Sequence, residues 1–362
     1  MNGILDPADA SVVGELRGWL QLQATLGLEP QLCAGLLGRL GDPVAALRES
    51  GRAAAWPGAR VESARLVLVR RGFVGLPLLS SMYPVGLKQL LDPAPLLCVA
   101  GDALALSRPA VAIVGARAAT GYGRRVARDL GAGLAQAGWV VVSGLARGVD
   151  AAAHEGALDV DGITVAVLGC GPDRVYPAEH ASLVRRIQRR GAVVSELSVG
   201  QPPKAAFFPL RNRLISGLTR LVVVVEARER SGSLVTARHA ADQSRDVAAV
   251  PGPIYSPTSV GPNRLILDGS RPVSSVEDLV GWLGQGSAPG VPSGPGDELG
   301  LAEDPILAQL REQSLCRDEL AERLGLSPHE LAARLVGLEV SGIVAEDRNG
   351  QLHPTGKPAA KR

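Results

Sequence analysis

The sequence has few cysteines, few aromatic residues, almost no lysine and no long hydrophobic run. Its four cysteines (Cys33, Cys98, Cys170 and Cys316) are far apart and form no CxxC pair. They indicate neither a disulfide framework nor a zinc cluster, and a reducing compartment fits best. No apolar run could span a bilayer, and the first residues lack the pattern of a secretory signal. We therefore expect a cytoplasmic protein that contacts no membrane, and we expect no metal and no cofactor.

The scarcity of lysine and aromatic residues makes any place that combines them conspicuous. The chain has 38 basic residues, and its lysines are Lys88, Lys204, Lys357 and Lys361. Aromatic residues make up 3% of the sequence and the formal net charge is +2. Binding of a nucleic acid requires a local basic patch rather than a basic chain, so this balance neither excludes nor demonstrates it.

The 362 residues are too many for one ordinary core and divide into regions of different composition. Residues 1–81 read as short helices and predict a small helical, SAM-like domain. Residues 82–283 alternate apolar runs with amphipathic stretches, which predicts an α/β domain with an extended Rossmann-like parallel sheet covered by helices on both faces. The predicted strands are residues 111–114, 139–142, 164–168, 193–195, 221–225 and 247–250.

The last part of the chain begins with a segment rich in Gly, Pro and Ser. Residues 284–303 are predicted to be a flexible linker. Residues 304–354 show three helical patterns, at 305–311, 317–324 and 328–340, followed by an extended pair broken at Asn349-Gly350, which is a strong hairpin signal. Three helices and a β-ribbon predict a C-terminal winged-helix domain. Residues 355–362 remain as a tail.

Unusual residues collect where the predicted strands end, and ligands bind beyond the carboxyl ends of strands in an open parallel sheet. Glycine lets the backbone approach a ligand, helix N-termini favour anions, and arginine matches phosphate. The alternative is that these glycines only form tight turns. The candidate residues at the strand ends are Gly115 and Arg117, then Ser143, Gly144 and Arg147, then Gly171, and finally Ser231 and Gly232.

Residues 203–213, PKAAFFPLRNR, contain one lysine, two of the three phenylalanines and two arginines that flank an asparagine. Cations for phosphates beside an aromatic ring for base stacking are typical of single-stranded nucleic-acid sites. We expect Phe207 to stack on a base and Phe208 to enter the core. The alternative is a loop whose phenylalanines are both buried and whose arginines are solvated. The candidates are Lys204, Phe207, Arg211, Asn212 and Arg213.

Several ordered motifs resemble the bacterial DNA-processing protein A family, called DprA or Smf. They are VGAR (114–117), SGLARGVDAAAH (143–154), LGCGPDRVYP (168–177), FPLRNRLISGL (208–218) and SGSLVTA (231–237). The resemblance covers residues from Tyr83 to about Asp278. By this resemblance, Arg117, Lys204, Phe207 and the run 211–213 would contact DNA. Ala116 stands where many members have serine, so one hydroxyl donor is missing there.

The resemblance implies a function as well as a fold. Such proteins bind single-stranded DNA without hydrolysing it and dimerise through the Rossmann-like domain. They protect incoming strands and help to load a RecA-type recombinase during natural transformation and DNA recombination. Residues 328–340, the third helical pattern of the winged helix, carry Arg334 as their one basic residue, so either a weak duplex contact or a protein contact is open for this domain.

Two other functions compete with this expectation. An N-glycosidase-related nucleotide-processing enzyme would need a PGGxGTxxE loop, but the chain reads RSGSLVTARHA at residues 230–240. A small-nucleotide sensor could use the same groove. His154 and Cys170 have no evident catalytic partner, while Asp150, Glu196 and Glu226 are expected to orient arginines or cap helices. We therefore predict a protein that is not an enzyme.

Overall fold

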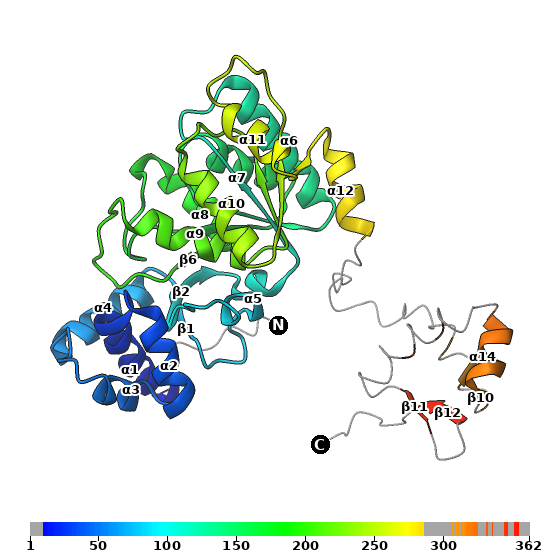
Figure 1. Cartoon of the computed structure of the whole chain (residues 1–362). Helices are drawn as coiled ribbons and strands as arrows, with labels where there is room; N and C mark the ends of the chain where they lie inside the picture. The colour runs from blue at the N-terminus through cyan, green and yellow to red at the C-terminus, as the bar shows by residue number, and fades with distance from the viewer. Residues whose placement is uncertain are drawn as a thin grey trace. The chain divides into compact units, whose positions relative to one another are not determined.

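The computed structural model describes residues 10–285 and, further on, 306, 309–310, 313, 315–324, 331, 335, 344–346 and 351–354. The chain forms two compact units, Met1–Val291 and Pro292–Arg362 (Figure 1). Among the helices of these described residues, none is both long and apolar enough to cross a membrane.

The first unit begins with four helices whose ends follow from their sequence. They are α1 (Ala10–Leu26), α2 (Pro30–Leu40), α3 (Pro43–Glu49) and α4 (Gly58–Arg70). Helix α2 starts at a proline and ends at Gly41, which has a φ of 65° and donates its N–H to the carbonyl of Leu37. Asp42 then caps α3 by accepting a hydrogen bond from the N–H of Ala45. These helices confirm the helical reading of this part of the chain.

A strand inside the range predicted to be helical changes the expected sheet. Strand β1 (Phe73–Pro77) pairs antiparallel with β2 (Leu96–Gly101), and β2 pairs antiparallel with β6 (Ala192–Ser195). The sheet therefore has an antiparallel edge that the sequence did not predict. The sequence FVGLP contains a glycine and a proline and shows no strict alternation, so the strand has almost no pattern by which to recognise it.

The nine-stranded sheet has the order β1-β2-β6-β5-β4-β3-β7-β8-β9. All the pairings from β6 to β9 across this order are parallel, which confirms the Rossmann-like core. Each of the six strands predicted from the sequence is present, with ends shifted by at most one residue. These six strands are β3 (Ala110–Val114), β4 (Val140–Ser143), β5 (Thr164–Val167), β6 (Ala192–Ser195), β7 (Leu221–Val224) and β8 (Asp246–Ala249). The short strand β9 (Arg271–Pro272) was not predicted.

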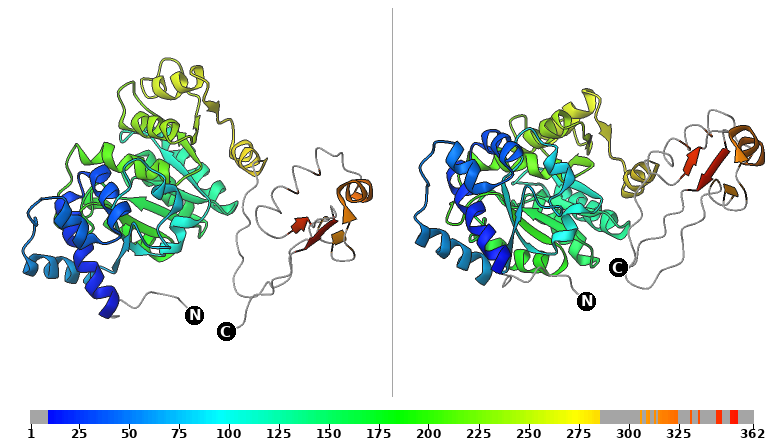
Figure 2. Two further views of the ribbon diagram at one scale, coloured as in Figure 1. Left: turned by 60° about the horizontal axis from the view of Figure 1, so that its bottom comes forward. Right: turned by 90° about the horizontal axis from the view of Figure 1, so that it is seen from below.

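Alternation along β3 shows how both faces of the sheet are buried. Val111 and Ile113 pack into a cluster with helices α6, α7 and α12, whereas Ala112 and Val114 pack into the cluster on the other face with α8, α9, α10 and the N-terminal helices. Helices thus cover both faces of the sheet (Figure 2). The covering helices are α6 (Gly121–Gln136), α7 (Val149–Asp159), α8 (Ala181–Arg190), α9 (Phe207–Gly217), α10 (Gly232–Asp242) and α12 (Val276–Gln285). Shorter elements are α5 (Val85–Lys88), η1 (Ala103–Ser107), η2 (Ala178–His180) and α11 (Val260–Leu267).

The second unit has a small core of its own. Strands β10 (Leu315–Cys316), β12 (Gln351–Pro354) and β11 (Val344–Glu346) form an antiparallel sheet in that order, and α14 spans Arg317–Leu324. Their core includes Leu320, Val344 and Leu352. The linker from residue 286, most of the third helical pattern, the turn at Asn349-Gly350 and the tail lie outside the described residues. The domain boundaries given above stay predictions.

Candidate nucleic-acid interface

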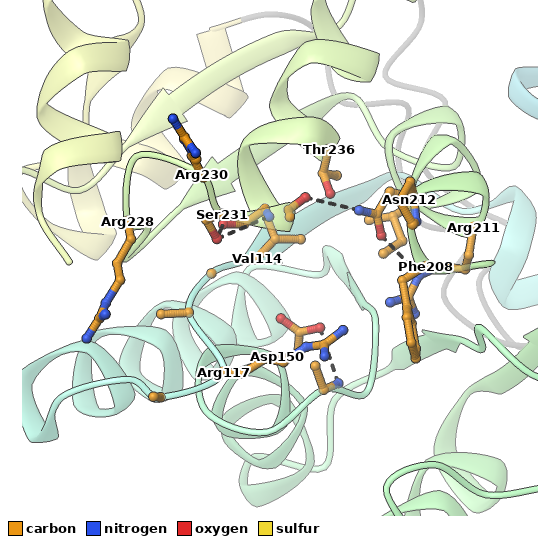
Figure 3. A pocket seen from close by; sticks show the side chains of 18 of the residues that line it. Val114, Arg117, Asp150, Phe208, Arg211, Asn212, Arg228, Arg230, Ser231 and Thr236 are labelled. Carbon is orange, nitrogen blue, oxygen red and sulfur yellow. Dashed lines mark hydrogen bonds between the residues drawn. The ribbon is translucent and has the colours of Figure 1, made fainter. Parts of the chain in front are cut away.

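The sheet changes direction of winding at β3, and a cavity lies at that point. From β3 the chain fills one side of the sheet with β4, β5 and β6, then returns to the other side of β3 with β7 and β8. The loops after β3 and β7 therefore diverge, which opens a crevice at the carboxyl ends of the strands. The cavity there measures about 720 Å³ and is lined by residues 114–118 after β3 and by Arg228 and residues 230–233 after β7 (Figure 3). We call it the switch-point cavity.

The structure brings eight of the thirteen predicted site residues to this region. Arg147 is exposed there and forms an ion pair of 2.5 Å with Glu179. A smaller cavity adjoins the first and shares Arg117, Phe208 and Arg211 with it. The switch-point cavity is lined by Gly115, Arg117, Arg211, Asn212, Ser231 and Gly232, and the smaller cavity also by Gly144 and Arg147.

The other five predicted residues line neither cavity. Ser143 is fully buried and its hydroxyl donates a hydrogen bond to the carbonyl of Ile113. Gly171 is buried in a turn, where an added Cβ would lie 2.7 Å from the carbonyl oxygen of Ser198. The prediction that these two residues face a ligand is wrong, because both are used inside the fold. Lys204 is exposed on the loop whose neighbours Pro203 and Ala205 line the cavity, so its contact stays a prediction.

The two phenylalanines differ in exposure in the opposite sense from that expected. Phe207 is only 7% exposed, whereas Phe208 lines both cavities. The Arg117 guanidinium carbon lies 4.8 Å from the centre of the Phe208 ring, and the Tyr176 ring lies 5.7 Å from it. Helix α9 begins at Phe207, and consecutive residues of a helix point about 100° apart, so the two rings cannot share a direction. The aromatic ring open to a ligand is that of Phe208.

Arg211 and Asn212 form part of the wall of the cavity. Arg211 is 4% exposed and donates hydrogen bonds to the carbonyls of Gly144, at 2.7 Å, and Val167. Asn212 accepts from Nε of Arg211 and donates to the carbonyl of Gly232. Burial and then the nearby charge of Arg117 lower the pKa of Arg211 to about 10, which still leaves it cationic at neutral pH. These bonds hold α9 against the loop after β4 and against the start of α10.

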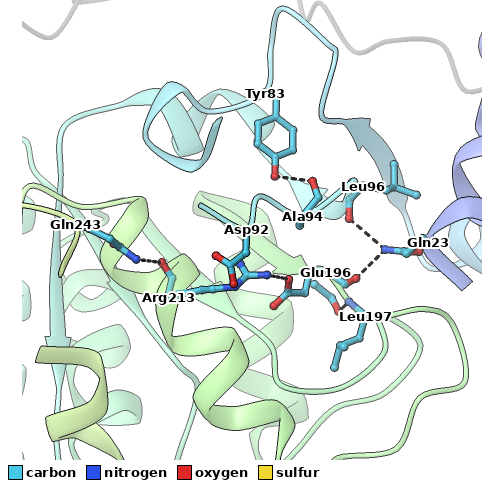
Figure 4. Close-up of polar contacts among 10 residues, drawn as sticks. Gln23, Tyr83, Asp92, Ala94, Leu96, Glu196, Leu197, Arg213 and Gln243 are labelled. Carbon is cyan, nitrogen blue, oxygen red and sulfur yellow. Dashed lines mark hydrogen bonds and ion pairs between the residues drawn. The ribbon is translucent and has the colours of Figure 1, made fainter. Parts of the chain in front are cut away.

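Arg213 points away from the cavity and is used inside the protein. Its guanidinium is paired with Glu196, between Nη2 and Oε2 at 2.6 Å, and with Asp92, between Nε and Oδ2 at 2.9 Å (Figure 4). The predicted DNA contact of Arg213 is therefore wrong, while the expectation that Glu196 orients an arginine is confirmed. Gln23 of α1 donates to the backbone carbonyl of Glu196 at 2.8 Å, which joins the N-terminal helices to the same network.

The loop after β4 is held in an uncommon conformation by Asp150. Its Oδ2 accepts hydrogen bonds from the backbone N–H groups of Gly144 and Ala146, at 3.1 and 3.3 Å. Between them Leu145 has a φ of 57°, and Gly148 has a φ of 78° with a Cβ position only 2.3 Å from the carbonyl oxygen of Ala116. Only glycine fits at residue 148, where this loop approaches the loop after β3.

Glu226 at the end of β7 is also committed to the fold. Its carboxylate accepts from the N–H of Thr120 at 2.9 Å and from the hydroxyl of Thr120 at 2.6 Å. Thr120 in turn caps α6 by accepting from the N–H of Gly123. Glu226 thus supports the cap of α6, as expected, whereas Asp150 holds a loop and, within the described residues, neither caps a helix nor pairs with an arginine.

Two arginines of the cavity were missed from the sequence. Arg228 and Arg230 line it from the loop after β7, and both are exposed with no ion pair in the described part of the chain. The sequence feature that could have identified them is the one that identified Arg117. All three arginines follow a parallel strand, at the edge of the sheet where ligands bind. With Arg117 they give the rim of the cavity three exposed cations. A phosphate-bearing ligand is the chemical class that such a rim attracts.

Comparison with known proteins agrees with this geometry. The model of the family described as DNA recombination-mediator protein A matches residues 76–284, and that of the DprA winged helix domain matches residues 291–350. The chain belongs to the DNA recombination-mediator protein A family. It is 38% identical over 314 residues to protein Smf of Escherichia coli, a match that covers 84% of each protein.

Two solved structures of the same family resemble the chain. DNA processing protein A of Streptococcus pneumoniae is 36% identical with a TM-score of 0.59, covering 66% of this chain and 82% of that one. DNA processing protein A of Helicobacter pylori is 30% identical with a TM-score of 0.54, covering 59% of this chain and 98% of that one. The Helicobacter pylori structure is described as giving insight into the single-stranded DNA binding mode of that protein. The winged-helix assignment of the C-terminal unit is confirmed by the family model.

His154 and Cys170, the residues that invite a catalytic role, are both buried. The His154 ring is fully buried and its Nδ1 lies 2.7 Å from the hydroxyl of Thr164, and burial lowers its pKa to about 3. Burial raises the pKa of the Cys170 thiol to about 11. Among the described residues, no group of three or more His, Cys, Asp or Glu side chains could hold a metal ion.

We predict that His154 makes the protein acid-sensitive. The imidazole is neutral when folded, whereas in the unfolded chain it takes up a proton near its ordinary pKa of 6.5. The contribution of the neutral His154 to the free energy of unfolding is complete above pH 6.5 and is lost as the pH falls towards 3. The free energy of unfolding is lower by about 2 kcal/mol at pH 5 for this reason. Urea unfolding across this range should show a shallower pH dependence in His154→Asn than in the wild type. Equal slopes would contradict the assignment.

Proposed function

We propose that this protein binds single-stranded DNA in the switch-point cavity. The observation that carries the proposal is the Arg117 guanidinium 4.8 Å from the centre of the Phe208 ring at the mouth of that cavity. An aromatic face on which a base can stack, beside exposed cations for the phosphates, suits a single strand whose bases are unpaired. The nearby arginines Arg228 and Arg230 extend the cationic rim.

We further propose that binding occurs without hydrolysis of the DNA. The carboxylates of Glu226 and Glu196 are engaged with Thr120 and Arg213, and the Cys170 thiol is held in its protonated form by burial. A nucleophile needs an activated group near a base, and neither His154 nor Cys170 is accessible. The chain would therefore act by holding DNA.

The family membership supports a mediator role in the cytoplasm. In this role the protein would protect incoming single strands and help to load a RecA-type recombinase during natural transformation and recombination. It would act as a homodimer formed through the Rossmann-like domain, and the winged helix would supply a weak duplex contact. Support comes from the family description, DNA recombination-mediator, and from relatives that carry the name DNA processing protein.

One titration separates this proposal from its alternatives. A labelled single strand is followed by fluorescence anisotropy while unlabelled single strand, duplex or mononucleotide is added as competitor. Efficient competition by single strand alone supports the proposal. Competition by a mononucleotide at similar concentration would instead indicate a nucleotide sensor, for which a cavity at the switch point is also suitable. Competition by duplex would assign DNA binding to another surface.

We predict that Arg117→Ala weakens single-strand binding because it removes a phosphate contact. The slope of log K against log salt should flatten by about 0.7 for this one contact. Arg39→Ala, which removes the same charge from the exposed end of α2, is the matched control and should leave the slope unchanged. Anisotropy across a salt series measures both. Identical slopes in the two variants would place the DNA outside the switch-point cavity.

A further inference from the structure

We propose that Asp150 reads the base that enters the switch-point cavity and favours bases with an exocyclic amino group over thymine. The inference rests on the proposed binding of single-stranded DNA and adds a base preference to it. Asp150 lines the cavity with only 6% of its surface exposed, deeper than the exposed arginines of the rim.

One oxygen of this carboxylate is used by the fold and the other is not. Oδ2 accepts the two backbone N–H groups of the loop after β4. Oδ1 accepts no hydrogen bond in the described chain, and it is not among the polar atoms sealed off from solvent. Arg117 and Arg211 are close enough to influence the charge of Asp150, but neither forms an ion pair with it. Oδ1 is thus a free acceptor that faces the cavity, where Figure 3 shows the carboxylate near Arg117.

A free carboxylate oxygen decides which part of a nucleotide can enter. A phosphate placed deep in the cavity would face a like charge, which is unfavourable in a partly desolvated site. Phosphates are better placed at the rim, with Arg117, Arg228 and Arg230. A bound ligand would bury Oδ1, and a buried acceptor without a hydrogen bond costs free energy. The ligand group that fits next to Oδ1 is therefore an N–H donor. A neutral base with a donor on its edge satisfies this requirement.

The four bases differ in what they offer to such an acceptor. Cytosine and adenine carry an amino group, and acidic side chains typically accept from the amino group of cytosine. Guanine offers an amino group beside a ring N–H. The single N–H of thymine lies between two carbonyl oxygens, which repel a carboxylate.

The test compares cytosine and thymine homopolymers of equal length, since both are pyrimidines of similar size. Burial raises the pKa of the Asp150 carboxyl group, so the anisotropy titrations are run at mildly alkaline pH to favour its ionised form. The wild type should bind the cytosine polymer about tenfold more tightly, the effect of one hydrogen bond to a charged group. In Asp150→Asn the amide oxygen still accepts from Gly144 and Ala146, while the amide nitrogen presents a donor to the cavity. The preference should then shift towards thymine.

Asp173→Asn is the matched control. Asp173 also accepts from a backbone N–H, that of Gly200 at 2.7 Å, but it lines neither cavity. Its variant should keep the wild-type ratio. Equal affinity of the wild type for both polymers overturns the base preference, and this result depends on no variant. An Asp150→Asn protein with the same ratio of cytosine-polymer to thymine-polymer affinity as the wild type also overturns it. If neither polymer binds at all, the proposed function itself fails.

Discussion

Glu196→Ala is expected to lower the free energy of unfolding by about 3–5 kcal/mol, because it leaves the buried guanidinium of Arg213 without its closest partner. Both side chains are at most 4% exposed, and the N–O distance between them is 2.6 Å. The second partner, Asp92, has a side chain 28% exposed and is better solvated. Urea unfolding followed by circular dichroism measures the loss.

A double variant tests whether the charge of Arg213 is the cause. In Glu196→Leu/Arg213→Met the isolated charge is gone, and apolar groups of similar volume can replace a buried ion pair at little cost. This protein should be more stable than Glu196→Ala, whereas Asp92→Ala should lose less than Glu196→Ala does. A double variant no more stable than the single one would show that Glu196 acts through packing alone.

Alanine at the two adjacent phenylalanines is expected to give opposite results. Phe207→Ala should lower the free energy of unfolding by about 3 kcal/mol, because the buried ring leaves a cavity. Phe208→Ala should weaken single-strand binding by roughly 1–3 kcal/mol, the usual loss of one stacked base. Its effect on stability should be the smaller of the two, since its ring lines open cavities.

Each phenylalanine variant is the control for the other. Unfolding curves and anisotropy titrations are measured on both, with binding assayed well below the melting temperature. A Phe207→Ala protein of full stability that has lost DNA affinity would return the stacking role to Phe207. A Phe208→Ala protein that binds as the wild type does would remove base stacking from the proposed mechanism.

Much of the fold was predictable because the parallel strands are short, apolar and separated by helix-length segments. The rule that ligands bind at the carboxyl ends of strands then brought Arg117 and Ser231 together although 114 positions separate them in the sequence. The winged helix was recognisable from its helical patterns and from the hairpin signal. These features depend on local periodicity and on topology, both of which are present in the sequence.

The roles of residues along α9 were not predictable in the same way. Phe207, Phe208, Arg211 and Arg213 are all residue types that suit a nucleic-acid site, but only Phe208 and Arg211 line the cavity, while Phe207 is buried and Arg213 pairs with Glu196. The direction of each side chain depends on the residue at which α9 begins. The proline and alanine residues before α9 are compatible with several different first residues. The buried partner of Arg213, Glu196, lies on another strand end. Distant pairings of this kind leave no local pattern.

Strand β1 affects where the protein can be divided for expression. Strand β2 has fully buried side chains from Leu96 to Val99 and is paired with β1 on one side and β6 on the other. A fragment that starts after β1, as a boundary at residue 82 would suggest, leaves one backbone edge of an apolar strand unpaired. Such an edge is a template for aggregation. A soluble recombinant fragment of the α/β unit therefore has to start ahead of Phe73, and the helices that precede β1 belong in it.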